Sequence, residues 1–190
     1  PAGAVPRSRK HPGRAAVAQP PLARDEVRYV GAPVAAIVAE HRAAAQSAIE
    51  KIVFSVAHAG TANDIRSAIT EGAARVHDNI DDNILGILEQ GDEARTEAAF
   101  ADAASVIKLD VVNNRLAPSA LEPRGCAATY DENSGEYVLY QGCQGVHSLR
   151  DRVLQCMPID ADKLHVVCPD VGGGFGFKAF LQCETVIVLH

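Results

Sequence analysis

Apolar residues in the first half of the chain form short runs, some with the spacing of strands and one with the spacing of a helix. The runs 27–30 and 34–39 are rich in valine and are separated by a Gly-Ala-Pro turn, so they predict two strands. Residues 42–51 place their apolar positions on one helical face, and the run 52–57 predicts a further strand. This order predicts a small α+β domain over residues 26–91.

The segments on either side of these elements have weaker patterns. Residues 1–25 are rich in proline, alanine and arginine and predict an extended lead-in. Within residues 59–91, the sequence NDIRSAI predicts one or two helical turns capped by Asn63. The residues that follow it contain too many turn formers to predict an element.

A second unit is predicted to begin near Asp92 and to cover residues 92–190. Asp92 is a suitable N-cap for a short amphipathic helix, in which Ala98, Ala99 and Phe100 would face inward. The alternating run 105–114 predicts a strand.

The clearest local pattern lies in residues 126–140, where two β-prone runs flank the turn sequence DENSGE and predict a hairpin. Residues 145–157 then carry four apolar side chains at helical spacing. After them we expect a strand at 163–168, a glycine-rich loop at 169–176 and a helix from 178 onward. The whole chain is therefore predicted to be of the α+β class.

The charge balance argues against a nucleic-acid partner. The formal net charge is -6, and no stripe of basic residues is interleaved with aromatic ones. Four residues near the start are basic: Arg7, Arg9, Lys10 and Arg14. They could form a basic arm or belong to a solvated terminus, and we favour the solvated terminus.

The five cysteines form neither a C-x-x-C pair nor a cysteine–histidine set with ligand spacing. This pattern argues against a disulfide framework and a zinc site, and it is typical of reduced thiols in a cytoplasmic protein. No apolar run reaches the ~18 residues of a membrane span, and the first residues lack the apolar core of a secretory signal. The sequence stops inside the apolar run ETVIVLH, so we expect a piece of a longer protein.

The sequence CPDVGGGFGFKAF, residues 168–180, concentrates four glycines between a predicted strand and a predicted helix. Such a loop can direct its N–H groups, together with the helix N-terminus, at an anion or an oxo group. Two nucleotide-binding patterns fail, because Phe177 occupies a position that each reserves for glycine and Ala179 follows Lys178 where the phosphate loop requires Ser or Thr. A tight turn with close packing is the structural alternative.

Four motifs together resemble the large subunit of the molybdenum hydroxylases, the group of xanthine dehydrogenase, aldehyde oxidase and carbon monoxide dehydrogenase. In chain order they are VRYVGAPVAAIVAE, LEPRGCAATYD, QGVHSLRD and VVCPDVGGGFGFKAF. The resemblance covers about residues 22–55 and 91–190. It implies that residues 26–91 belong to an α/β hammerhead domain and residues 92–190 to the N-terminal part of a molybdopterin-binding domain.

The resemblance also implies a cofactor site. Gln144 would approach the oxo ligand of the molybdenum, and the backbone at Gly174, Phe175 and Gly176 would hydrogen-bond at the metal and the pterin. The pterin dithiolene would hold the metal, so no protein metal ligand is expected. Fixed N–H donors and an amide suit an oxo group, which a carboxylate would repel. Without the resemblance, Gln144 could equally be a surface amide, and His147 is better read as a helix-start residue with a structural hydrogen bond than as a base.

By the same resemblance, the protein would oxidise an aldehyde, an N-heterocycle or carbon monoxide, with water as the oxygen source. The cofactors would be molybdopterin in its cytosine dinucleotide form with molybdenum, and FAD and [2Fe–2S] clusters on flavin-binding and iron–sulfur partner subunits. The general base would lie beyond His190. Ala179 stands where purine-hydroxylating members carry a glutamate, and Phe177 brings the sequence closer to the bacterial carbon monoxide dehydrogenase-like branch.

Two other readings remain open. One is an inactive truncated fragment, or a binding or assembly module without catalysis, and we expect the isolated piece to be inactive. The other is a nucleotide-binding protein that uses the glycine loop for phosphates, which the two failed patterns disfavour.

Overall fold

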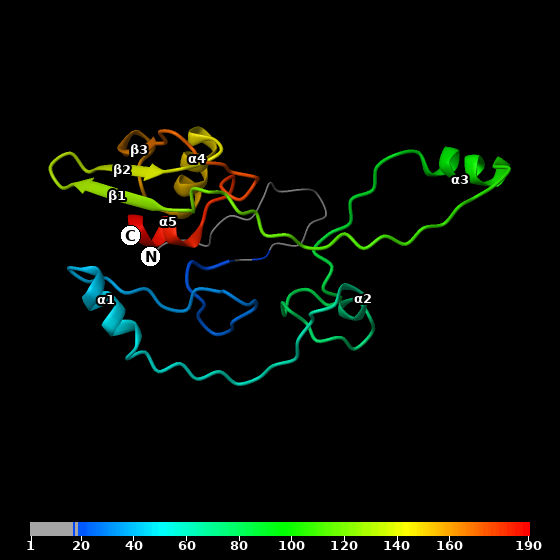
Figure 1. Ribbon diagram of the computed structural model, residues 1–190, viewed down its shortest axis with the longest axis horizontal. Helices are drawn as coiled ribbons and strands as arrows, with labels where there is room; N and C mark the ends of the chain where they lie inside the picture. The colour runs from blue at the N-terminus through cyan, green and yellow to red at the C-terminus, as the bar shows by residue number, and fades with distance from the viewer. Residues whose placement is uncertain (1–16, 18) are drawn as a thin grey trace.

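The computed structural model describes residue 17 and residues 19–190 (Figure 1). Most of the predicted lead-in, residues 1–25, therefore lies outside the described residues. The elements in chain order are α1 (Arg42–Ile49), α2 (Ile65–Ala68), α3 (Glu93–Asp102), β1 (Cys126–Asp131), β2 (Glu136–Gln141), α4 (Val146–Cys156), the 3-10 turn η1 (Ala161–Lys163), β3 (Leu164–Val167) and α5 (Cys183–Leu189). Helices and one small mixed sheet place the chain in the α+β class.

The sheet has the strand order β1-β2-β3. The hairpin predicted at 126–140 is confirmed: β1 and β2 pair antiparallel, with Cys126 opposite Gln141. Asp131 closes the turn, because its carboxylate accepts the N–H of Asn133 at 2.9 Å and its carbonyl accepts the N–H of Gly135 at 2.7 Å. β3 then pairs parallel to β2, and α4 forms the crossover between them.

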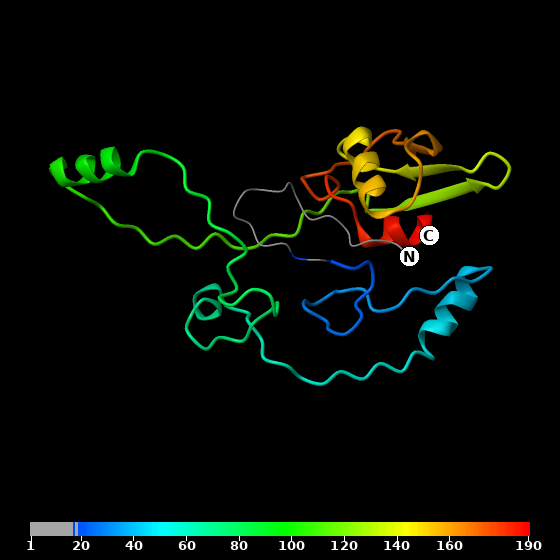
Figure 2. The ribbon, with the colours of Figure 1, turned by 180° about the vertical axis from the view of Figure 1, so that it is seen from behind.

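One face of this sheet is packed and the other is open to solvent. Burial alternates along β3, where Leu164 is buried and His165 is exposed, as expected for successive side chains on opposite faces. Leu139 of β2 shares the packed face and forms a core with Val153 of α4 and Val186 of α5. α4 and α5 lie beside the sheet in both the front and the back view (Figures 1 and 2).

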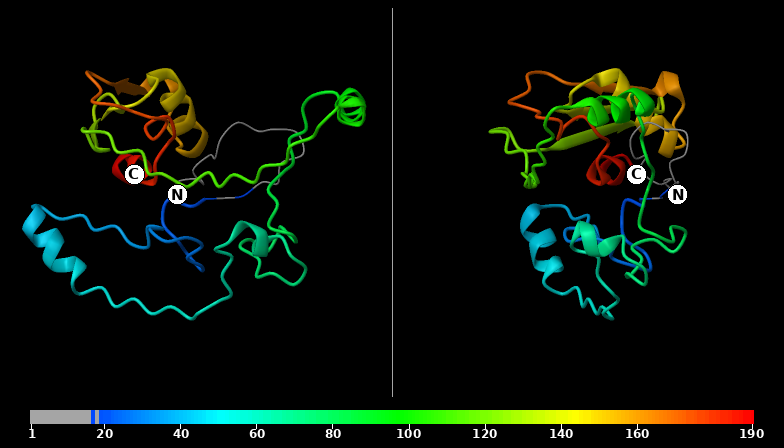
Figure 3. Two further views of the ribbon diagram at one scale, coloured as in Figure 1. Left: turned by 45° about the vertical axis from the view of Figure 1, so that its right-hand side comes forward. Right: turned by 90° about the vertical axis from the view of Figure 1, so that its right-hand side faces the viewer.

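The part of the chain before the hairpin has almost no core. Ile80 is the one buried residue among those described from 19 to 125. The helix α3 stands at the far end of two long extended segments, away from the sheet (Figure 1 and the left panel of Figure 3). None of the residues of α1, α2 or α3 is buried.

Four predicted strands do not form, although their residues are described: 27–30, 34–39, 52–57 and 105–114. A strand satisfies its backbone N–H and C=O groups only through a neighbouring strand. Within residues 19–190 no second segment pairs with any of these four, and side chains such as Val53 (95% exposed) remain in solvent. The hammerhead arrangement of residues 26–91 therefore stays a prediction.

The predicted helices form with small changes. The helix expected at 42–51 is α1, and Asp92 caps α3 by accepting the N–H of Arg95 at 3.0 Å. The prediction that Ala98, Ala99 and Phe100 face inward is wrong, because none of the residues of α3 is buried and Phe100 is 56% exposed. The cap of α2 is Asp64 and not Asn63, since the carboxylate of Asp64 accepts the N–H of Ser67.

No helix in the part of the chain that the structure describes combines the length and the apolar character needed to cross a membrane.

Candidate cofactor-binding site

Two segments with unusual chemistry follow the carboxyl ends of neighbouring parallel strands. Gln144 comes three residues after the end of β2, and the glycine loop, which we define as Gly172–Gly176, follows β3. The carboxyl ends of parallel strands lie at the same edge of a sheet, which is where open α/β sheets commonly bind ligands. The sheet therefore brings together two segments that are far apart in sequence.

Gln144 packs directly on the glycine loop. A Cβ atom added to Gly174 would lie 2.7 Å from both Cδ and Oε1 of Gln144, far closer than real Cβ atoms approach other atoms. The backbone N–H of Gln144 also donates to the carbonyl of Lys178 at 3.2 Å. Glycine is therefore required at position 174 for the Gln144 side chain to keep this position.

The loop has a backbone conformation that L-residues seldom adopt. Gly173, Phe175 and Gly176 have φ angles of 97°, 50° and 80°. A bulky residue such as Phe175 at positive φ is strained, and strain of this kind concentrates at functional sites. The turn is held by the Phe177 N–H, which donates to the Gly174 carbonyl at 2.8 Å.

The site offers hydrogen-bond donors that no described protein atom uses. The backbone N–H groups of Gly174, Phe175 and Gly176 donate to no described residue, and neither does the exposed side-chain amide of Gln144. Space is open at Gly176, where an added Cβ would meet nothing within 4 Å. Neutral N–H donors around an open space suit an oxygen-rich or anionic group.

An ion pair that the sequence analysis missed anchors the loop from the other side. The Glu122 carboxylate accepts from Lys178 Nζ at 2.5 Å and from the N–H of Gly172 at 2.8 Å. The hydrogen bond from Lys178, followed by that from Gly172, lowers the pKa of Glu122. The side chain of Lys178 is only 2% exposed, and a lysine so buried needs a carboxylate partner. A lysine inside the apolar sequence FGFKAF could have indicated that a carboxylate partner exists, but the sequence did not show which carboxylate it is.

Arg124 borders the same region. Its guanidinium lies 4.4 Å from the centre of the Phe177 ring and 3.4 Å from the carboxylate of Glu184, and it donates to Gln182. A cavity of about 740 Å³ opens beside the loop. Its lining includes Glu122, Arg124, Gln141, Phe177, Gln182 and Thr185.

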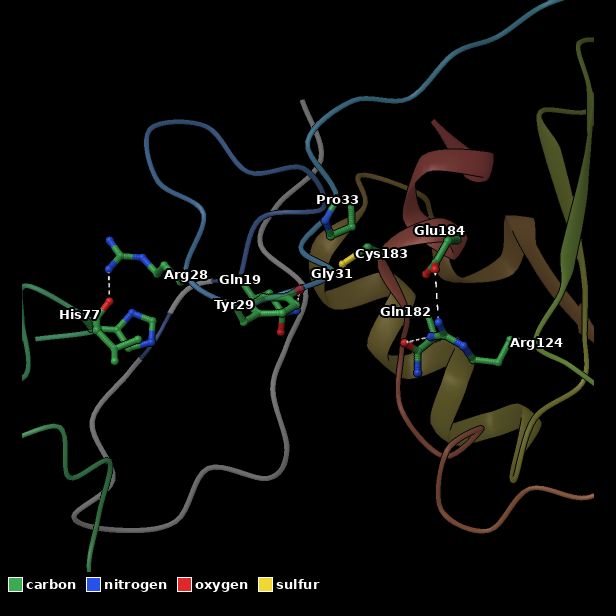
Figure 4. Close-up of a pocket in the computed structure, with 11 residues that line it drawn as sticks. Gln19, Arg28, Tyr29, Gly31, Pro33, His77, Arg124, Gln182, Cys183 and Glu184 are labelled. Carbon is green, nitrogen blue, oxygen red and sulfur yellow. Dashed lines mark hydrogen bonds and ion pairs between the residues drawn. The ribbon is translucent and has the colours of Figure 1, made fainter. Parts of the chain in front are cut away.

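A second cavity of about 540 Å³ lies between this region and the first part of the chain. Figure 4 shows Arg124 with Gln182 and Glu184 on one side of it, and Tyr29 with Gln19 on the other. The amide of Gln19 donates to the Tyr29 hydroxyl at 3.0 Å. Residues far apart in sequence thus meet beside α5.

Two expectations about the site are corrected. The helix after the loop begins at Cys183 and not at 178, because a turn at 175–178 and a non-helical segment at 179–182 precede it, so its N-terminus does not adjoin the glycine loop. His147 makes no hydrogen bond through its side chain to any described residue. It is exposed on the first turn of α4, where water can satisfy the ring nitrogens.

Among the described residues, the cysteines are neither paired with one another nor grouped with other possible metal ligands. None of the five cysteines forms a disulfide, and within residues 19–190 no three His, Cys, Asp or Glu side chains are grouped to hold a metal ion. Burial raises the pKa of the Cys126, Cys143 and Cys156 thiols, which keeps them protonated and poor metal ligands near neutral pH.

Residues 76–190 match the molybdopterin cofactor-binding domain family. The match covers more than half of the chain, so the chain belongs to that family.

The relatives and the similar solved structures agree with this assignment. The chain is 32% identical to the nicotine 6-hydroxylase large subunit of Paenarthrobacter nicotinovorans over 93% of its length, and 32% identical to the carbon monoxide dehydrogenase large chain of Afipia carboxidovorans over 83%. It also resembles the crystal structures of the Cu,Mo-CO dehydrogenase (TM-score 0.78) and of quinoline 2-oxidoreductase from Pseudomonas putida 86 (TM-score 0.75). Each structure is 30% identical and covers 90% of this chain.

The chain spans about a fifth of the length of these curated relatives, 21% of each, and 22–23% of the two solved chains. The resemblance inferred from the four sequence motifs is confirmed.

Proposed function

We propose that this chain works as part of the large subunit of a molybdenum-dependent oxidoreductase. The subunit would oxidise an aldehyde, an N-heterocycle or carbon monoxide, with water as the oxygen source, in the cytoplasm. The observation that carries the proposal is the packing of Gln144 on Gly174 at the shared edge of β2 and β3. It joins an amide donor and a row of backbone donors in a chain of the molybdopterin cofactor-binding family.

The residues at this edge fit a molybdenum cofactor. Gln144 and the backbone N–H groups of Phe175 and Gly176 would hold oxygen atoms of the cofactor, and the lack of a side chain at Gly176 leaves room for a bulky group. When bound, the cofactor supplies the redox centre that takes two electrons from the substrate. We further propose its cytosine dinucleotide form, with FAD and [2Fe–2S] clusters on partner subunits and a general base beyond His190.

The protein groups act by pre-organisation. Glu122 binds both Lys178 and the N–H of Gly172, so the first residue of the loop and a residue just beyond its end are tied to one carboxylate. Donors that are fixed in advance need not reorganise when charge develops on a bound oxygen. The phenyl ring of Phe175, which is 72% exposed, would shield the bound group from water.

Position 179 bears on the substrate class. Ala179 offers only a methyl group, and its carbonyl accepts from Arg152 at 3.2 Å, which fixes the backbone there. No carboxylate is available at this position to hydrogen-bond a purine. We therefore propose a substrate other than xanthine.

A pair of glycine variants tests the site in the complete enzyme that carries this chain. Gly174→Ala inserts a Cβ where Gln144 lies, whereas Gly125→Ala inserts one where nothing lies within 4 Å. We expect Gly174→Ala to lower the molybdenum bound per enzyme by about tenfold, the range of supporting-residue mutations at metal sites. Gly125→Ala should match the wild type, and Gln144→Ala should lower the metal content as Gly174→Ala does.

Elemental analysis and release of the pterin as a fluorescent derivative measure both components of the cofactor. A wild-type enzyme without stoichiometric molybdenum would refute the proposed function. Normal metal content in both Gly174→Ala and Gln144→Ala would refute the proposed site but not the function.

A second function, an assembly module without catalysis, is favoured by one observation. Many large apolar side chains of residues 19–125 are exposed, among them Ile107 and Leu121, as expected of surfaces that dock onto other chain segments. The 190-residue chain expressed alone discriminates between the two. Pterin that copurifies with it would exclude an inert module, and a chain that retains none would leave catalysis to the longer protein.

A further inference from the structure

Two cysteines that precede the two segments of the proposed site lie close together. The backbone N–H of Cys143 donates to Sγ of Cys168 at 3.3 Å, and the Cys168 thiol lies 3.7 Å from the carbonyl oxygen of Cys143. The two thiols also interact with each other, since Cys168 adds to burial in raising the pKa of Cys143. These contacts join the segments that follow β2 and β3.

The contact between the two cysteines keeps their Cα atoms near the separation that a disulfide spans. The 3.3 Å contact joins the main chain of Cys143 to the sulfur of Cys168, so only a few bonds separate the two Cα atoms from it. Disulfides span Cα distances of about 4.4–6.8 Å, a range that such a contact includes. Cys143 follows the last residue of β2 by two positions and Cys168 follows β3 directly, so neither takes part in the pairing of the two strands.

The two thiols differ in exposure. Cys143 is 7% exposed, whereas Cys168 is partly exposed at the surface. A small oxidant therefore reaches Cys168 first, and Cys143 is placed to resolve the product. A partly exposed thiol next to a second cysteine can be oxidised reversibly, because the second cysteine can resolve the sulfenic acid to a disulfide.

We propose that Cys143 and Cys168 form a peroxide-sensitive thiol pair. The sulfur of Cys168 attacks hydrogen peroxide, an S–O bond forms as the O–O bond breaks, and the released hydroxide takes the thiol proton to give water. The sulfur of Cys143 then attacks the sulfenic acid, an S–S bond forms as the S–O bond breaks, and a second water leaves. Two thiols lose two electrons, and one peroxide is reduced to two waters.

The bond would change the neighbouring residues. Cys143 precedes Gln144, and Cys168 lies four residues before Gly172. A covalent link between the two segments would replace the N–H···S hydrogen bond and alter the position of the Gln144 side chain relative to Gly174. The thiol pair exists in the chain itself, so the proposal stands independently of the cofactor.

Peptide mapping of the full chain after treatment with hydrogen peroxide tests the pair. We expect two of the five thiols to be lost and to return with dithiothreitol. Trypsin cuts after Arg124, Arg150, Lys163 and Lys178, so the linked product joins peptide 125–150 to peptide 164–178. Peptide 125–150 also contains Cys126, and the map is therefore repeated in the Cys126→Ser variant, which should give the same link.

The single variants separate the two steps. Cys143→Ser should leave Cys168 as a sulfenic acid that dimedone traps, and Cys168→Ser should lose no thiols at the same peroxide dose. Cys156→Ser is the matched control and should give the wild-type link. Five unchanged thiols in the folded wild-type chain, or a link that uses Cys126, Cys156 or Cys183 instead, would overturn the proposal. The peptide map of the wild-type chain can refute the proposal by itself, so the test does not depend on whether each variant folds.

Discussion

Residues 126–190 and residues 19–125 differ in how they use similar apolar sequences. The run YVLY in β2 and the run VIKLDVV after α3 are both rich in β-prone residues. Leu139 in the first is fully buried, whereas Leu109 in the second is 80% exposed. The difference is that β2 has neighbours on both sides, β1 and β3, and the second run has none among the described residues.

Helices do not show this contrast, because an α-helix satisfies its backbone within its own segment. α3 forms although none of its residues is buried, with Asp92 supplying the cap. Whether a β-prone sequence forms a strand thus depends on the segments beside it, whereas a capped helix can form from its own residues alone.

The strongest test of this comparison removes one leucine from each region. Leu139→Ala leaves a cavity in the core and should lower the free energy of unfolding by about 2–5 kcal/mol. Leu109→Ala removes an exposed side chain and should stay within about 0.5 kcal/mol of the wild type. Urea unfolding followed by circular dichroism measures both free energies. Equal losses would show that the region of Leu109, residues 19–125, is packed in solution.

The next largest effect concerns the glycine loop. A Cβ at Gly172 would lie 2.6 Å from Cβ of Glu122 and 3.4 Å from its backbone nitrogen, so no side-chain rotation relieves the clash. Gly172→Ala should therefore cost about 1–3 kcal/mol of unfolding free energy, as overpacking usually does. Gly125→Ala, which meets nothing within 4 Å, is the control. If the two variants had the same urea midpoint, residues 118–124 would not approach the loop as closely as the structure shows.

The Glu122–Lys178 pair predicts a dependence on pH. The pKa of Glu122 is lowered in the folded chain, so the pair stabilises the fold above the ordinary pKa of 4.5 and loses this effect as the pH falls through the lowered value. Glu122→Gln should thus be less stable than the wild type at neutral pH, and the two should converge in acid. Urea midpoints across this range measure the difference. Glu132→Gln, at a hairpin glutamate outside the described ion pairs, should show no such convergence.

The smallest expected effect is local. Asp92→Ala removes the cap of α3 and should weaken that helix by about 0.5 kcal/mol, the low end for exposed caps. Hydrogen exchange should speed up in residues 93–102 and stay unchanged in β2, because none of the residues of α3 is buried. Faster global unfolding or altered protection in β2 would contradict the separation of the two regions.

The sequence predicted the part of the fold that depends on neighbours in the chain. The hairpin at 126–140, α1, α3, α4 and β3 follow from turn residues, caps and apolar spacing. The absence of the four predicted strands could not be foreseen from such patterns, because a β-prone run does not reveal whether a partner strand lies beside it.

For the site, residue types were predictable and distances were not. The glycine cluster and Gln144 were identified from the sequence, and the structure brings Gln144 and Gly174 into contact. Glu122 was missed, because its pairing with buried Lys178 depends on how residues 118–124 cross the loop. The roles of Gln144, Phe175 and Gly176 in cofactor binding remain predictions.

The short stretch of chain that joins β2 to the glycine loop has a consequence for how the coding sequence can recombine. The amide of Gln144 and the donors of the glycine loop are contributed by one uninterrupted strand–helix–strand unit, residues 136–176. Any recombination event with breakpoints outside the codons of this unit transfers both groups together, already in register with each other. Gene fusion, gene splitting and exchange between relatives can therefore rearrange the rest of the coding sequence while this pair of donor groups passes on intact.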